Sequence, residues 1–193
     1  MKVGVLALQG DFSEHCHLLH RIGVDAVEVR LPSQLKDLDG LIIPGGESTT
    51  IGKLAVAYHL IEALREFAAS KAVWGTCAGA IFLSKEARHQ QPLLGVMDIT
   101  VERNAFGRQI DSFEADLAID ALQSVSPSNP AYHAVFIRAP LIEKVGDGVE
   151  ILSRLPDQKI VAARQGRLLA TSFHPELTSD DRFHRYFAQL CQG

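Results

Sequence analysis

Residues 72–83 read AVWGTCAGAIFL: an apolar, β-prone run, a turn flanked by glycines, and a run that favours a helix. A fully apolar strand is typical of a parallel sheet covered on both faces. The same order occurs twice upstream, where residues 3–8 lead into a helical stretch at 11–22 and residues 38–43 into one at 49–69. Alternating strands and helices predict an α/β fold, a parallel sheet with helices on both faces.

Local signals place the element boundaries. A further strand is expected at residues 24–29. Asp11, with Glu14 three residues later, fits a capping box at the start of the first helix. The apolar spacing predicts one amphipathic helix through residues 49–69, and a second helix from residue 78 to about 87.

The pattern changes after residue 90, where short β-prone runs are joined by brief turns. They predict antiparallel additions and then a return to the main sheet, with runs at 96–103, 114–119, 134–138, 149–155, 159–164 and 168–173. Residues 123–131 read as a loop, and Thr178 or Ser179 is expected to cap a last helix. With no linker or repeat in between, residues 1–193 are predicted to form a single domain.

Composition excludes several classes of protein. The chain has 193 residues, 47% hydrophobic and 22% charged, and a net charge of -4 without long charge runs. This balance argues against nucleic acid or an anionic membrane as partner. The start, MKVGVLALQG, lacks the length and cleavage site of a signal peptide, and no apolar stretch approaches the roughly 18 residues that span a bilayer. We therefore expect a cytoplasmic protein.

The segment GTCAG at residues 75–79 has the form G-x-C-x-G between a strand and a helix. This is the cysteine analogue of a nucleophile elbow, in which small neighbours allow a sharp turn and the helix N-terminus favours a thiolate. Cys77 is the candidate nucleophile, and the Ala78 N–H can face a developing oxyanion. A tight turn around a buried thiol remains the alternative. Cys16 and Cys191 are interpreted as ordinary packed or surface thiols, because three cysteines are too few for a disulfide framework.

A thiol nucleophile needs a base, and the base needs an orienting group. His174 follows the apolar run at 168–173, and Glu176 lies two residues later, on the same side of an extended segment. The pair stands at the strand end where active sites of open α/β sheets gather. His15, His17 and His20 are interpreted as a helix surface, and no spacing indicates a metal site.

The turn PGGESTT at residues 44–50 directly follows the third strand. Its glycines let the backbone approach a ligand, so Gly46 N–H is a candidate second oxyanion donor. A glycine-rich turn before a helix can instead hold phosphate, but Glu47 would repel an anion and no G-x-x-x-x-G-K-[ST] pattern is present.

Taken together, these motifs resemble class I, triad-type glutamine amidotransferases. The longer blocks resemble the glutaminase subunits of two-protein pyridoxal 5′-phosphate synthases and cover essentially the whole chain: LALQGDFSEH, PGGESTTIGKL, GTCAGAIFLSKE, VERNAFGRQIDSFEADL, VFIRAP and SFHPELT. The resemblance implies a three-layer, flavodoxin-like α/β/α sandwich with a mostly parallel sheet and a small antiparallel addition. It also implies hydrolysis of L-glutamine, with the ammonia passed to a synthase subunit, and no cofactor.

The resemblance further implies roles for particular residues. The triad would be Cys77, His174 and Glu176. The substrate contacts would be Gly46, Glu47, Ser48, Arg103, Ile137 and Arg138. Glu47 suits the α-ammonium of glutamine and an arginine suits its α-carboxylate. Gln9 would take part in partner contact or in the oxyanion hole.

Two other kinds of interpretation remain open. A glutaminase that serves a different synthase would share the elbow and triad, but not the VERN and FIRAP blocks. Against a DJ-1-like cysteine hydrolase or chaperone, the H-P-E triplet at a terminal strand favours the amidotransferase. A binding module with Cys77 as redox sensor would not need the paired His174 and Glu176.

Overall fold

The computed structural model describes residues 1–103 and 112–193. One half of its main sheet is parallel and is formed by the strands that the sequence alternation predicts. In sheet order, neighbouring strands are β2 (Asp25–Val29), β1 (Lys2–Leu6), β3 (Gly40–Ile43), β4 (Ala72–Thr76) and β12 (Leu168–Thr171). The last of these strands in sequence therefore lies beside β4, in the interior of the sheet.

The other half of the sheet is mostly antiparallel. It continues from β12 through β11 (Ile160–Gln165), β9 (Leu141–Val145), β6 (Met97–Glu102) and β5 (Ser84–Ala87). β10 (Glu150–Arg154) pairs with β11 beside this path. The strand β9 was missing from the sequence prediction, since LIEKV carries only a short apolar signal.

A separate hairpin is formed by β7 (Ser112–Leu117) and β8 (Tyr132–Ile137). Short 3₁₀ helices lie at η1 (Pro32–Leu35), η2 (Asp120–Ser124) and η3 (Pro175–Leu177). The first residues of the predicted loop at 123–131 thus belong to η2.

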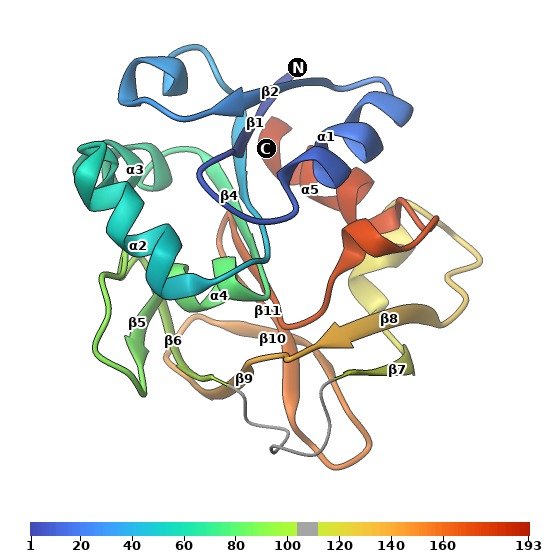
Figure 1. The fold of residues 1–193 in the computed structure, drawn as a ribbon. Coiled ribbons are helices and arrows are strands. Elements are labelled where there is room, and N and C mark those ends of the chain that lie inside the picture. The colour runs from blue at the N-terminus through green and yellow to red at the C-terminus, as the bar shows by residue number, and fades with distance from the viewer. Residues whose placement is uncertain (104–111) are drawn as a thin grey trace.

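Helices cover both faces of the parallel half (Figure 1). α1 (Phe12–Arg21) and α5 (Arg182–Gln192) pack on one face, and α2 (Ser48–Ala57), α3 (Leu60–Ala68) and α4 (Ala78–Leu83) pack on the other. The expected three-layer α/β/α sandwich is confirmed. Among the described residues, no helix combines the length and apolar character needed to cross a bilayer.

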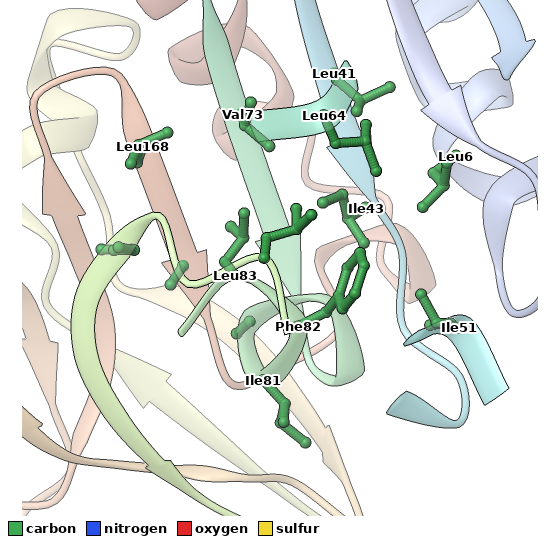
Figure 2. Packing of buried hydrophobic residues seen from close by; sticks show 14 of the residues in the cluster. Leu6, Leu41, Ile43, Ile51, Leu64, Val73, Ile81, Phe82, Leu83 and Leu168 are labelled. Atoms are coloured by element: carbon green, nitrogen blue, oxygen red, sulfur yellow. The ribbon is translucent and has the colours of Figure 1, made fainter. Parts of the chain in front are cut away.

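Two buried clusters fill the spaces between these layers. Alternate residues of each strand point to opposite faces, so Val73 packs with the α2–α4 side while Trp74 packs with the α1–α5 side. Figure 2 shows the first cluster, in which Ile43 lies beside Phe82 of α4. This packing fixes α4 against the sheet directly behind Cys77.

The single helix predicted for residues 49–69 is wrong. The chain forms α2 and α3, which are separated at Tyr58 and His59. His59 has a φ of 57°, the left-handed conformation that ends a helix. The apolar spacing continues across the break, which is why periodicity alone did not reveal it.

Three further boundary predictions need correction. The helix predicted to reach residue 87 ends at Leu83, because the next four residues form β5 and pair with β6. The last helix begins at Arg182 instead of following directly from Thr178 or Ser179. Asp11 makes no side-chain hydrogen bond to the start of α1, so the predicted capping box is absent.

Candidate active site

Four sequence motifs meet at one edge of the sheet. Gln9 follows β1, Gly46 follows β3, Cys77 follows β4 and His174 follows β12. These four strands are consecutive neighbours and run parallel, so their carboxyl ends lie side by side. Ligands of open α/β sheets bind at this edge.

A cavity of about 430 Å³ lies at this edge. It is lined by Gln9, Gly10, Asp11, Gly46, Glu47, Ser48, Cys77, Ala78, Ile81, Arg103, Ile137, Arg138, His174 and Leu177. Every residue that the sequence assigned to substrate, oxyanion or partner contact is in this lining. Glu176 is not, because it lies behind His174 with only 5% of its surface exposed.

Cys77 has the strained backbone expected of an elbow, with φ 48° and ψ -106°. Its amide donates a hydrogen bond to the Thr171 carbonyl at 2.8 Å, which ties the turn to β12. A Cβ at Gly79 would collide with the Ile43 carbonyl, and one at Gly75 with the backbone of Gly79. The two glycines are therefore required for the close approach of α4 to the sheet.

The strain at Cys77 leads to a stability prediction. We expect Cys77→Gly to be about 1 kcal/mol more stable than Cys77→Ala, because glycine relieves the positive φ and this outweighs its larger unfolded-state entropy. Urea denaturation of the two variants measures the difference. The same pair at Cys16, in the middle of α1, is the control and should show the opposite order. An alanine variant as stable as the glycine variant at residue 77 would contradict the strain.

His174 stands between the thiol and a carboxylate. Its Nδ1 lies 2.6 Å from Oε1 of Glu176, and only 4% of the residue is exposed. Burial by itself lowers the pKa of His174, but hydrogen bonds to Cys77 and Glu176 outweigh it and raise that pKa to about 10. Burial raises the pKa of Glu176, and the hydrogen bond from His174 offsets part of this rise. These contacts favour the protonated form of His174, which lies between the candidate nucleophile and the Glu176 carboxyl.

The glycine turn after β3 is held by Gln9. The Glu47 amide donates to Oε1 of Gln9 at 2.6 Å. Gly46 has a φ of 148°, and a Cβ there would meet the Gln9 side chain. Gln9 thus supports the turn that carries the candidate oxyanion donor, a contact that the sequence did not specify.

Glu47 is already engaged in this state. Its carboxylate accepts from the Thr49 and Thr50 amides and from the Thr50 hydroxyl, at the start of α2, and Arg103 Nη2 lies 2.8 Å from its Oε1. Desolvation opposes ionisation, but these bonds and Arg103 lower the pKa of Glu47 to about 2. Glu47, expected to bind the α-ammonium of the substrate, is therefore paired with Arg103, one of the two arginines expected in the pocket.

The remaining predicted contacts are Ile137 and Arg138 at the end of β8 and Ser48 at the start of α2. Ile137 is 37% exposed, and its carbonyl lies 3.9 Å from Sγ of Cys77. Arg138 has a φ of 44°, a second strained position beside the nucleophile. Ser48 donates from Oγ to Oε1 of Gln91 at 3.0 Å. Residues 104–111, which belong to the VERNAFGRQIDSFEADL block, lie outside the described residues.

Sequence reasoning missed four residues of the lining: Gly10, Asp11, Ile81 and Leu177. Asp11 matters most, because its Oδ2 lies 3.7 Å from Nδ1 of His174. Burial raises the pKa of this carboxyl. Its position just after β1, beside Gln9, was the signal that could have placed it at the site.

Asp11, His174 and Glu176 also bring ligand atoms within 4.8 Å of one another, a spacing that a metal ion can use. However, Nδ1 of His174 is the atom that faces both carboxylates, and at 2.6 Å from Glu176 it acts as a proton donor. A protonated nitrogen cannot ligate a metal. The arrangement suits acyl transfer better than metal binding.

Several known proteins that match this chain over nearly its full length share one name. Pyridoxal 5'-phosphate synthase subunit PdxT of Herpetosiphon aurantiacus is 57% identical over 195 residues, which cover 98% of this chain and 100% of that protein. The protein of the same name from Chloroflexus aggregans is 55% identical with the same coverage. These relatives confirm the resemblance inferred from the motifs.

Solved structures agree. One described as a crystal structure of glutamine amidotransferase has a TM-score of 0.91 and 53% identity, and the match covers 99% of each chain. A putative GMP synthase component from Thermoplasma acidophilum has a TM-score of 0.70 at 17% identity, covers 100% of this chain and 94% of its own, and supports the fold alone. The model of the SNO glutamine amidotransferase family matches residues 5–193. The chain belongs to the SNO glutamine amidotransferase family.

Proposed function

We propose that this chain hydrolyses L-glutamine to L-glutamate and ammonia and passes the ammonia to a pyridoxal 5′-phosphate synthase partner. That partner would condense it with ribose 5-phosphate and glyceraldehyde 3-phosphate to make vitamin B6. The observation that carries the reaction is the buried contact of His174 with Glu176 at the cavity that Cys77 lines. Family membership and full-length relatives named as synthase subunits support the substrate and the partner.

The first half of the reaction forms a thioester. The Cys77 thiolate attacks the side-chain amide carbon of glutamine, and the carbonyl oxygen becomes an oxyanion. The N–H groups of Gly46 and Ala78 stabilise this oxyanion, and loss of one such donor typically costs about 10²–10³ in rate. His174 then gives its proton to the leaving nitrogen, so that ammonia departs as the tetrahedral intermediate collapses.

The second half releases glutamate. His174, now neutral, takes a proton from water as the water attacks the thioester carbon. Collapse of this second intermediate breaks the carbon–sulfur bond and restores the thiolate and the imidazolium. Glu176 holds the imidazole in one orientation throughout and stabilises its charged form. No cofactor or metal is required by these steps.

Substrate binding would rearrange the pair of Glu47 and Arg103. Glutamine carries an α-ammonium and an α-carboxylate, and each suits one member of this pair. Ser48, Ile137 and Arg138 would complete the pocket. Because Glu47 and Arg103 form an ion pair with each other here, glutamine binding has to break this pair and replace it with two contacts to the substrate.

We assign the whole of residues 1–193 to one glutaminase domain, since β12 lies between β4 and β11 and so joins both ends of the chain in one sheet. We place the reaction in the cytoplasm. Cys16, Cys77 and Cys191 are all free thiols, as expected in a reducing compartment, and a thiol nucleophile has to stay reduced.

Glutaminase activity with and without the synthase tests this function. We expect slow glutamine turnover by the chain alone and a clear increase when the synthase is added, because ammonia released without an acceptor is lost. Glutamate and ammonia are measured together, and Cys77→Ala is the negative control. Absence of turnover in the complex would overturn the glutaminase assignment, and equal turnover with and without the synthase would overturn gating by the partner.

A further inference from the structure

His15 is buried behind the candidate triad. The sequence suggested a helix surface for it, yet the side chain on α1 is 0% exposed. Its Nε2 lies 3.3 Å from Oε2 of Glu176 and 3.2 Å from Oγ1 of Thr76. The contact is to the carboxylate oxygen that His174 does not use, since His174 bonds Oε1.

Oε2 of Glu176 has no regular hydrogen bond within residues 1–103 and 112–193. A buried carboxylate oxygen without a donor is costly. The ring nitrogen of His15 is therefore well placed to stabilise the charge of Glu176. The distance is longer than an ideal hydrogen bond, because one N–H faces both Glu176 and Thr76.

A second buried histidine determines which nitrogen of His15 carries the proton. Nδ1 of His15 lies 2.9 Å from Nε2 of His184, which is 0% exposed on α5. Burial lowers the pKa of His15 well below its usual value and that of His184 to about 3, so both rings are neutral. Their rings pack against Trp74, with centroids 5.6 and 5.0 Å from its ring, and all three residues are fully buried.

Only one assignment of protons suits the neighbours. If His184 donates from Nε2 to Nδ1 of His15, then His15 carries its proton on Nε2 and presents it to Glu176 and Thr76. In the opposite assignment, a lone pair on Nε2 of His15 would face the carboxylate, which is repulsive. His184 would also bury an unpaired N–H, since its Nδ1 has no partner among the described residues.

We propose that His15 is a positioning residue for glutamine hydrolysis, which holds Glu176 ionised and aimed at His174, with His184 fixing the His15 tautomer. This inference rests on the proposed glutaminase function. It connects α5 and α1 to the nucleophile through a line of side chains: His184, His15, Glu176, His174 and Cys77.

Other charged or titratable groups around this line come from several elements. The titratable groups that act on His15 or Glu176 include His184 on α5, His174 after β12, Asp11 before α1 and Tyr132 on β8. Of these, Asp11 raises the pKa of Glu176 and His174 lowers it. Removal of the His15 N–H should raise the pKa of Glu176 further, because a hydrogen-bond donor to a carboxylate favours its charged form.

The test is the pH dependence of kcat/KM for glutamine in the complex with the synthase. We expect His15→Leu to lower kcat by about 10- to 100-fold, the usual effect of losing a hydrogen bond to a charged group. KM should stay nearly constant, because His15 does not line the cavity.

The acid limb of the kcat/KM profile should move to higher pH, since Glu176 then binds its proton more tightly. His15→Gln keeps a donor at the position of Nε2 and should restore most of the rate and the acid limb, whereas His15→Asn should not.

Leu19→Ala is the matched control. Leu19 is equally buried on α1 but packs in the α1–α5 core cluster. It should lower the melting temperature without moving the acid limb. An acid limb that is the same in wild type, His15→Leu and His15→Asn would overturn the positioning role. Absence of glutaminase activity in the wild-type complex would instead overturn the proposed function.

Nitrogen NMR of the wild-type chain provides a second measurement that does not depend on variants that fold poorly. The His15 ring should keep its proton on Nε2 and remain neutral between about pH 6 and pH 8. A proton on Nδ1, or a charged ring at the upper end of this range, would contradict the proposal.

Discussion

Glutamine hydrolysis by the synthase complex is expected to fall by about 10⁴- to 10⁶-fold in Cys77→Ser, with the fold and the complex intact. Serine can occupy the same strained elbow, but its hydroxyl is a far weaker nucleophile than a thiolate at neutral pH. Steady-state release of glutamate measures the loss, and thermal unfolding shows that the variant is folded. Wild-type turnover in Cys77→Ser would remove the basis of the mechanism.

The other two cysteines provide matched controls. Burial raises the pKa of Cys16 to about 11 and that of Cys191 to about 12, so both stay as thiols. Neither lines the cavity. Cys16→Ser and Cys191→Ser should therefore keep full activity, and a thiol-alkylating reagent should inactivate the wild type by modifying Cys77 alone.

Substitution of His174 is expected to have the next largest effect. His174→Gln should lower kcat by about 10²–10⁴-fold, because glutamine cannot deliver a proton to the departing ammonia or accept one from water. The KM for glutamine should change much less. Single-turnover measurements should show that both formation and hydrolysis of the thioester are slowed.

His133 is a suitable control for this variant. It too lies between carboxylates, with nitrogen atoms 2.9 Å from Asp116 and Glu114, but it is exposed on the β7–β8 hairpin. Hydrogen bonds to these acids raise its pKa. His133→Gln should leave turnover unchanged. An equal loss in both histidine variants would show that the effect at residue 174 is not specific to the triad.

The fold class could be read from the sequence because its strongest signal is repeated. Apolar strands followed by helices give the parallel half of the sheet, with every strand in place. The errors fall where a tertiary contact decides between two acceptable local structures. Residues 84–87 have helical propensity, but they pair with β6 and become β5. Nothing in the sequence near His59 marks the break between α2 and α3.

The part of the candidate site that could be predicted consists of residues at the ends of strands. Gln9, Gly46, Cys77 and His174 are each adjacent to an apolar run, and topology brings them together. Contacts between side chains were not predictable. Glu47 looks free in the sequence, yet it binds Arg103 and caps α2. His15 looks like a surface residue because its neighbours on α1 are polar, while its own face is covered by α5.

The position of β12 has a consequence for synthesis on the ribosome. This strand follows all the other described strands in the sequence, yet it separates β4 from β11 in the finished sheet. Until β12 emerges, no strand pairing among the described residues joins the parallel half of the sheet to the antiparallel half. The pairing of β12 with β4 forms late, because these two strands are far apart in the sequence. Cys77 is thus synthesised about a hundred residues before His174. We therefore expect no glutamine hydrolysis by a chain that ends before His174.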